Sequence, residues 1–210
     1  MSRHSKNKES MKYEVDILES HTGYQGFFKL KRYRLRHSLF QGGWSNEIVR
    51  ERLEGKRAVG VLLYDPLLDC VVLIEQFRIG AMEGSKDAWL LEVVAGLLDR
   101  KEPEEALARR ESLEEANCEC LDLIPMCDYY VSPGATSERL RLFCGRVDAS
   151  DAGGCFGLEN EGEDIRVVVM SFDEAISELD TGRANSASII IALQWLILHK
   201  DEIKQKWLSD

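Results

Sequence analysis

Residues 96–118, GLLDRKEPEEALARRESLEEANC, contain the pattern that decides the fold of this chain. The segment opens with a glycine and ends in clustered acidic residues. On a helix, the α-carbons of Glu111, Glu114 and Glu115 would lie within about a 100° sector. Like charges at this spacing destabilise a helix by roughly 0.2–0.5 kcal/mol per pair, so they call for compensation. A hard divalent cation provides it, because Mg²⁺ takes oxygen ligands and bridges carboxylates to substrate phosphates.

The segment resembles the Nudix box, written G-x5-E-x7-R-E-U-x-E-E-x-G-U, where U is a bulky aliphatic residue. Three positions depart from the pattern: Ser112 and Cys118 stand where aliphatics are usual, and Asn117 replaces the second glycine. Asn is the next-best residue for a left-handed helix cap, and Ser112 is expected to weaken packing rather than chemistry. An ordinary acidic surface helix would not explain the order of glycine, turn and helix. The six positions that match at the required spacing are Gly96, Glu102, Arg110, Glu111, Glu114 and Glu115.

Length and charge limit the possible functions. A chain of 210 residues fits one large domain, or a core with a smaller appendage. Its formal net charge of −10 argues against a nucleic-acid-binding surface, which is normally basic. An anionic substrate would therefore need metal ions and local arginines to reverse the field at its site.

Cysteine usage and hydropathy indicate a cytoplasmic protein with no membrane association. The six cysteines include no C-x-x-C pair, and no signal peptide is recognisable, so reduced thiols are expected. Residues 1–10 are polar and basic, which predicts a disordered tail. The longest apolar run, residues 189–198, is too short to span a bilayer.

Hydrophobic patterning predicts a mixed sheet between helices. Two β-branched runs joined by a turn read as a hairpin, and a capping box at Ser171 and Glu174 starts a helix after the last strand. In the Nudix resemblance this is an α/β/α sandwich with a mixed β-sheet, preceded by a small β-rich domain. The expected domains are a dimerisation region at residues 11–55 and a Nudix domain at 56–210. The expected strands are 13–36, 44–51, 57–64, 70–77, 90–95, 124–130, 140–147 and 165–170. The expected helices are the box helix, with Pro103 at an early helical position, and two others that span about 172–182 and 187–206.

Beyond the box, much of the chain looks like bacterial ADP-ribose pyrophosphatases. The Ser-Pro-Gly segment at residues 132–134 is what favours a nucleoside diphosphate linked to a sugar. The resemblance implies hydrolysis of ADP-ribose to AMP and ribose 5-phosphate with Mg²⁺, or Mn²⁺, as cofactor. Two alternatives stay open: another substrate such as GDP-mannose, or a sensor that binds ADP-ribose without cleaving it. The intact box carboxylates argue against the sensor. The matching segments are 26–28, 73–78, 89–96, 132–139, 161–165 and 191–196.

The resemblance also implies a catalytic site. Glu161 would take the proton from the attacking water, although its loop, residues 157–164, also contains Glu163 and is by composition typical of a solvated linker. Glu114 would bind metal directly or through water, and Arg110 would support the site by pairing with Glu102. The implied metal ligands are the Ala95 carbonyl, Glu111, Glu114, Glu115 and Glu163.

The same resemblance implies a set of substrate-binding residues, and a purely structural role is the alternative for these residues. The phenylalanines could stack on adenine in the partner's site of a homodimer with exchanged N-terminal regions, or could pack in a core. The arginines could contact the diphosphate, or could line a solvated strand edge. The Ser-Pro-Gly turn could simply reverse the chain. The implied residues are Phe27, Phe28, Arg50, Arg52, Arg78, Leu97, Gly134 and Glu138.

Overall fold

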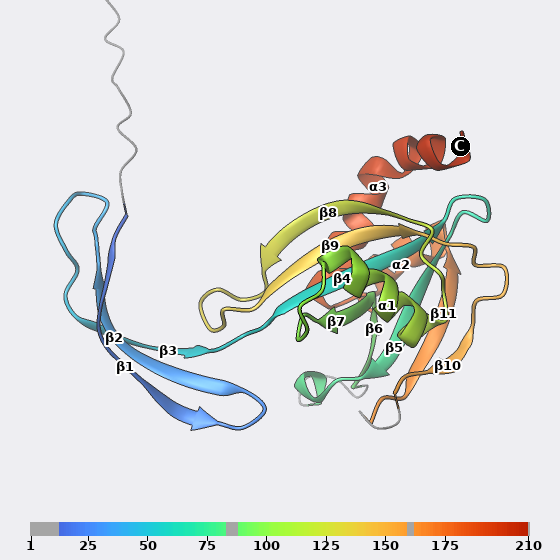
Figure 1. Cartoon of the computed structure of the whole chain (residues 1–210). Helices are drawn as coiled ribbons and strands as arrows, with labels where there is room; N and C mark the ends of the chain where they lie inside the picture. The colour runs from blue at the N-terminus through green and yellow to red at the C-terminus, as the bar shows by residue number, and fades with distance from the viewer. Residues whose placement is uncertain (1–12, 83–87, 159–161, 210) are drawn as a thin grey trace, which may run out of the picture. The chain divides into compact units, whose positions relative to one another are not determined.

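The computed structural model describes residues 13–82, 88–158 and 162–209, which form two compact units (Figure 1). The first unit contains the described residues up to Gly55, together with Ser132–Ser137. The second contains the described residues of Lys56–Val131 and those from Glu138 onward. The tail expected at residues 1–10 lies outside the described part.

The first unit is a three-stranded antiparallel sheet in the order β1-β2-β3. Its strands are β1 (Val15–Gln25), β2 (Lys29–His37) and β3 (Ile48–Leu53). Among its described apolar residues only Tyr33 is buried, whereas Val15, Ile17 and Tyr24 on β1 are exposed. A sheet normally needs one covered face to be stable. The low apolar content of this region therefore leaves it almost without a core of its own.

The second unit is built on an eight-stranded mixed sheet with the main order β10-β11-β5-β4-β9-β8. β4 runs parallel to β9, and the other pairs are antiparallel. The predicted hairpin is confirmed, because Leu63 pairs with Val72 and Asp65 pairs with Cys70. The strands are β4 (Arg57–Asp65), β5 (Cys70–Phe77), β6 (Trp89–Glu92), β7 (Val94–Leu97), β8 (Asp122–Tyr130), β9 (Arg139–Arg146), β10 (Gly154–Phe156) and β11 (Ile165–Ser171).

The single strand expected at residues 90–95 is wrong, because the structure has two strands there. β6 pairs with β5, and β7 pairs with β4. β4 and β5 pair with each other beside their turn, from Leu63↔Val72 to Asp65↔Cys70. Farther from the turn, β4 and β5 no longer pair with each other. There β5 pairs with β6 and β4 pairs with β7, so the buried backbone groups of both strands keep hydrogen-bond partners. The short strand β10 was not expected, because three residues give no periodic pattern.

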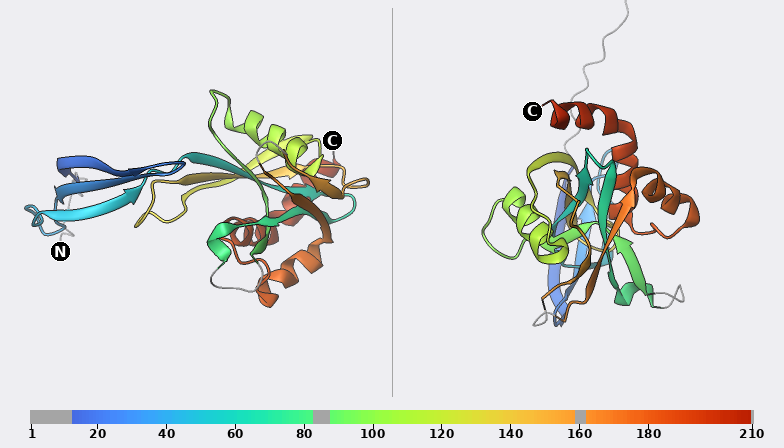
Figure 2. Two further views of the ribbon diagram at one scale, coloured as in Figure 1. Left: turned by 90° about the horizontal axis from the view of Figure 1, so that it is seen from below. Right: turned by 90° about the vertical axis from the view of Figure 1, so that its right-hand side faces the viewer.

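Helices cover both faces of this sheet, which confirms the α/β/α architecture. They are α1 (Glu104–Ala116), α2 (Phe172–Thr181) and α3 (Ala187–Leu208), with a short 3₁₀ helix, η1 (Ile79–Ala81). α1 packs Leu107 on one face, and α2 and α3 pack Ala175 and Ile189 on the other. Figure 2 shows α1 and the α2–α3 pair on opposite sides. No helix within the described residues is long and apolar enough to cross a membrane.

The helix ends follow the predicted capping chemistry. Ser171 and Glu174 form the complete capping box that starts α2, and Gly182 ends this helix with a φ of +77°. Asn117 ends α1 in the left-handed conformation, with a φ of +50°. Pro103 is the extended residue just before α1, rather than a residue within its first turn. Ser112 is buried in α1, and its hydroxyl donates to the Ala108 carbonyl at 2.7 Å, so this polar group is satisfied.

Candidate active site

The Nudix-box segment brings a strand end against a helix. β7 ends at Leu97, and α1 begins at Glu104, with Leu107 buried in the sheet-facing core. A Cβ atom at Gly96 would overlap the Oε1, Cδ and Cγ atoms of Glu111. A residue larger than glycine would therefore push the Glu111 carboxylate out of its position. The first position of the box is a glycine because the helix carboxylate lies directly against this backbone.

Glu115 is the most buried acidic residue of the site, with 4% of its surface exposed. Its Oε2 accepts a hydrogen bond from the Ala95 N–H at 3.0 Å. Burial raises the pKa of Glu115 to about 8; the Ala95 hydrogen bond opposes this rise, and the charges of Glu111 and Glu163 add to it. A carboxylate held in this environment gains strongly from a nearby cation.

Arg110 connects two carboxylates of α1 with a third from the segment before the helix. Its guanidinium contacts Glu102 at 3.0 Å, Glu111 at 3.0 Å and Glu114 at 2.8 Å. The Arg110–Glu102 pair expected from the sequence is therefore present. Burial raises the pKa of Glu111, and the Arg110 charge opposes that rise. Glu114 is directed to Arg110, whereas Glu111 and Glu115 lie against the backbone of β7.

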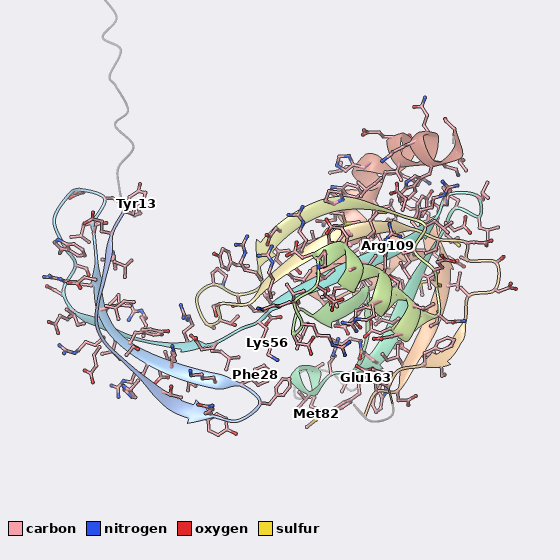
Figure 3. The ribbon with its side chains drawn as sticks, viewed as in Figure 1. Tyr13, Phe28, Lys56, Met82, Arg109 and Glu163 are labelled. Carbon is pink, nitrogen blue, oxygen red and sulfur yellow. The ribbon has the colours of Figure 1, made fainter. Side chains whose placement is uncertain are left out.

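Glu163 comes from the loop between β10 and β11 and is labelled in Figure 3. The Leu158 N–H donates to its carboxylate at 3.0 Å, and the Glu163 N–H donates back to the Leu158 carbonyl at 3.3 Å. Gly157 has a φ of +111°, and a Cβ there would lie 2.8 Å from the Glu163 Cβ. The Glu163 charge raises the pKa of both Glu111 and Glu115, so the three carboxylates share one electrostatic environment. Glu161 lies outside the described residues.

The donor set fits a hard divalent cation. Glu111, Glu115 and Glu163 offer carboxylate oxygens, the ligand type that Mg²⁺ and Mn²⁺ prefer. Within the described residues, no group of three or more His, Cys, Asp or Glu side chains has metal-binding geometry. Each of the three carboxylates is engaged by a protein donor: Arg110, the Ala95 N–H or the Leu158 N–H. These donors must be exchanged or shared for the carboxylates to converge.

Arg78 adds a cation to the same region. Its Nε donates to Glu92 at 2.7 Å, and its charge lowers the pKa of Glu115. Glu92, the partner of Arg78, was not among the expected residues, although it stands out in the sequence as a single acid after the apolar run Trp-Leu-Leu. Leu97 follows Gly96 directly at the end of β7. Glu138 immediately precedes β9 in this unit.

The other predicted substrate-binding residues belong to the first unit. Phe27 and Phe28 lie in the β1–β2 connection, are 79% and 52% exposed, and meet edge-to-face with ring centroids 5.0 Å apart (Figure 3 labels Phe28). Core packing within the chain is therefore not their role. Arg52 pairs with Glu54 at 2.6 Å. The remaining predicted residues of this unit are Arg50, on β3, and Gly134, in the Ser132–Ser137 segment.

Comparisons with known proteins agree with this architecture. The family described as NUDIX domain matches residues 55–193. A protein of Escherichia coli (strain K12) named ADP-ribose pyrophosphatase is 45% identical over 196 residues, covering 93% of this chain and 94% of that protein. A Haemophilus influenzae protein of the same name is 41% identical, with 92% and 91% coverage. A GDP-mannose pyrophosphatase of Pectobacterium atrosepticum is 34% identical, with 90% and 96% coverage.

A solved structure described as an ADP compounds hydrolase superposes with a TM-score of 0.65 over 87% of this chain and 94% of that one. At 20% sequence identity, this likeness shows a shared fold. The family match includes the strand that ends at Gly96 and the helix that carries Glu111 and Glu115. Relatives above 40% identity cover nearly the whole chain. This protein therefore belongs to the NUDIX domain family.

Proposed function

We propose that this protein hydrolyses the diphosphate of ADP-ribose, giving AMP and ribose 5-phosphate, with Mg²⁺ or Mn²⁺ as cofactor. The observation that carries the proposal is the buried Glu115 carboxylate, held by the Ala95 N–H beside Glu111. A site of this kind binds a cation that in turn binds phosphate oxygens. The relatives named ADP-ribose pyrophosphatase support the choice of substrate.

The protein's own groups have separate roles in this reaction. Glu111 and Glu115 would hold the cation together with the Ala95 carbonyl and Glu163, and Glu114 would act directly or through water. When bound, the cation supplies charge neutralisation of the diphosphate and a lower pKa for the attacking water. Arg110 keeps the helix carboxylates in place through its three ion pairs.

The general base is proposed to be Glu161. It shares a loop with Glu163, which the Leu158 N–H holds at 3.0 Å and whose charge acts on both Glu111 and Glu115. A carboxylate on the same loop could receive the proton of an attacking water near the cation. Glu163 itself is the alternative base, and titration of the two variants with metal separates the roles.

Substrate contacts are proposed for a further set of residues. Arg78 would leave Glu92 to bind the diphosphate, because a guanidinium forms stronger, bidentate contacts with phosphate. Leu97 and Glu138 would line the nucleoside side of the site. The first unit would contribute its own residues, which are Phe27, Phe28, Arg50, Arg52 and Gly134.

We further propose that the protein is a homodimer in which the region of residues 11–55 is exchanged between subunits, next to a catalytic domain of residues 56–210. The exposed apolar side chains of the first unit support this, since almost none of its surface is covered from within. An aromatic ring in the β1–β2 connection, either Phe27 or Phe28, would then stack on the adenine in the other subunit's site.

A cytoplasmic location is proposed as well. All six cysteines, each of which lies within the described residues, are free thiols. Burial raises the pKa of Cys144 and of Cys120 above the ordinary value, which keeps these thiols protonated and unreactive. Unpaired, buried thiols are typical of proteins from reducing compartments.

GDP-mannose is the second candidate substrate, because relatives at 32–34% identity are named GDP-mannose pyrophosphatases. The test is incubation of the pure protein with Mg²⁺ and a panel of nucleoside diphosphate sugars, with products separated by chromatography. We expect ADP-ribose to be cleaved with the highest kcat/KM, and Glu115→Gln to abolish cleavage. Preferred cleavage of GDP-mannose would support the second candidate. Binding of ADP-ribose without products would instead indicate a sensor.

A further inference from the structure

Gln76 has a buried amide nitrogen without a hydrogen-bond partner among the described residues. It lies on β5 and is 7% exposed. Its Nε2 is inaccessible to solvent and has no hydrogen-bond partner within the part of the chain that the structure describes. An amide nitrogen carries two N–H donors, and buried polar groups are nearly always paired. A donor left over in the interior therefore needs an explanation.

Strand register places this amide on the same face as the metal-site helix. Gln76 pairs with Leu90, and Ile74 pairs with Glu92, between β5 and β6. Directly opposed residues share a face, as do residues two apart along a strand. Ile74 belongs to the buried cluster that contains Leu107 of α1. Gln76 and Glu92 therefore lie on the α1 face of the sheet.

The ion pair between Arg78 and Glu92 runs past Gln76. The Arg78 N–H donates to the Ala88 carbonyl at 2.7 Å, which continues the ladder of β5 and β6 by one step and keeps Arg78 on the same face. Glu92 lies opposite Ile74, two residues to the other side of Gln76. A bond of 2.7 Å between Arg78 and Glu92 must therefore reach across the Gln76–Leu90 pair. The unpaired amide lies beside this ion pair.

We propose that Gln76 is a substrate-binding residue, whose amide donates to a phosphate oxygen of the bound nucleoside diphosphate when Arg78 turns from Glu92 to that substrate. This inference rests on the proposed function. Phosphate oxygens only accept hydrogen bonds, and a guanidinium and an amide NH₂ both offer donors, so the two groups suit the same ligand.

The second N–H of the amide could bind the Glu92 carboxylate, which loses its partner when Arg78 moves. The Glu92 side chain is only 13% exposed, so the loss of its arginine would leave a poorly solvated carboxylate. Gln76 lies on the same face, one residue pair away. One N–H can therefore replace the Arg78 contact to Glu92 while the other binds phosphate. Without substrate, Glu92 is already paired with Arg78, and the amide nitrogen of Gln76 has no partner among the described residues.

A role in core packing alone predicts unchanged substrate binding in a variant that keeps the side-chain length, whereas the proposed role predicts weaker binding. Gln76→Met keeps the length of an unbranched side chain and removes both donors. Because the wild-type amide nitrogen is buried without a partner among the described residues, the loss of its two donors should leave the melting temperature of the metal-free protein equal or higher. If Gln76 served only to fill the core, the variant would be no more stable and would bind substrate normally.

The experiment first measures hydrolysis of ADP-ribose by the wild type, which tests the proposed function on its own. KM with Mg²⁺, and Kd for ADP-ribose by calorimetry in EDTA, are then compared for wild type, Gln76→Met and Gln76→Glu. We expect an increase of about 10-fold for methionine, in the range for a hydrogen bond to a charged group, and a larger one for glutamate, which also repels phosphate. Gln194→Met, at an exposed position of α3, is the matched control and should change nothing.

The outcomes separate the two claims. A wild type that cleaves ADP-ribose, with unchanged KM and Kd in Gln76→Met, would overturn the role of Gln76 and leave the proposed function standing. Equal losses for methionine and glutamate, together with a lower melting temperature, would also overturn it, because they indicate a disturbed core. A wild type that neither binds nor cleaves ADP-ribose would overturn both.

Discussion

Replacing Glu115 with glutamine should make the metal-free protein more stable and the enzyme inactive. The amide oxygen of the introduced glutamine can still accept the Ala95 N–H, so Glu115→Gln removes a charge while keeping the hydrogen bond. A rise of the Glu115 pKa from 4.5 to about 8 corresponds to roughly 5 kcal/mol of unfavourable free energy for the ionised folded state. Protonation of Glu111 can relieve part of the repulsion in the wild type. We therefore expect the unfolding free energy of Glu115→Gln to exceed that of the wild type by about 2–5 kcal/mol.

The gain should depend on pH in one direction. Because the folded pKa of Glu115 lies above its unfolded value, this group favours folding below pH 4.5. That contribution is lost as the pH rises toward about 8. The wild type and Glu115→Gln should therefore have similar unfolding free energies near pH 4.5, the ordinary value, and differ most above about pH 8. Urea unfolding in EDTA, followed by circular dichroism at several pH values, measures this difference.

Glu114→Gln is the matched control, because it makes the same change on the same helix. The Glu114 side chain is more exposed and contacts Arg110 at 2.8 Å, so removing its charge should not stabilise the metal-free protein. With Mg²⁺ present, Glu115→Gln should lose turnover by orders of magnitude. A stability difference that is constant with pH, or near-normal activity at saturating Mg²⁺, would refute the assignment of Glu115 as a buried metal ligand.

Gly96→Ala should reduce kcat by about 100-fold, because the new Cβ displaces the Glu111 carboxylate. Gly80→Ala is its control and should leave steady-state rates unchanged, because a Cβ at Gly80 meets nothing within 4 Å. Glu163→Gln should raise the Mg²⁺ concentration for half-maximal rate, whereas Glu161→Gln should lower kcat by roughly 10²–10⁴-fold without rescue by metal; the reverse pattern in a Mg²⁺ titration would exchange their roles. Light scattering should give the mass of a dimer at working concentration, and an active monomer would contradict the exchanged arrangement.

The helix α1 could be predicted from the sequence because its determinants are local. The spacing of Glu111 and Glu115 follows from the helix period, and Asn117 ends the helix in the left-handed conformation that this residue tolerates. The capping box at Ser171 is equally local. Gly96 was expected from the motif alone, but its reason, the contact with the Glu111 carboxylate, is visible only in the structure.

Features that depend on distant partners could not be predicted. Residues 90–95 were expected to form one strand, although the segment divides into β6, which pairs with β5, and β7, which pairs with β4. The sequence shows Arg78 as a cation that could bind phosphate, but not that Glu92 holds it. The grouping of Ser132–Ser137 with the first unit also arises from tertiary contacts, since Leu53 donates to the Ala135 carbonyl across a long stretch of chain.

The burial of these carboxylates would both destabilise the fold and favour the binding of a cation. Ionised Glu115 lowers stability by up to roughly 5 kcal/mol because burial removes its water and Glu111 and Glu163 repel it. A ligand that binds only the folded state, at a concentration of about 100 times its Kd, stabilises that state by about 2.7 kcal/mol. Metal binding would therefore offset a large part of the loss in folding stability that the ionised carboxylates cause. Each carboxylate is meanwhile held by a protein donor, so the protein can fold before a cation binds, and a cation would have to displace or share these contacts.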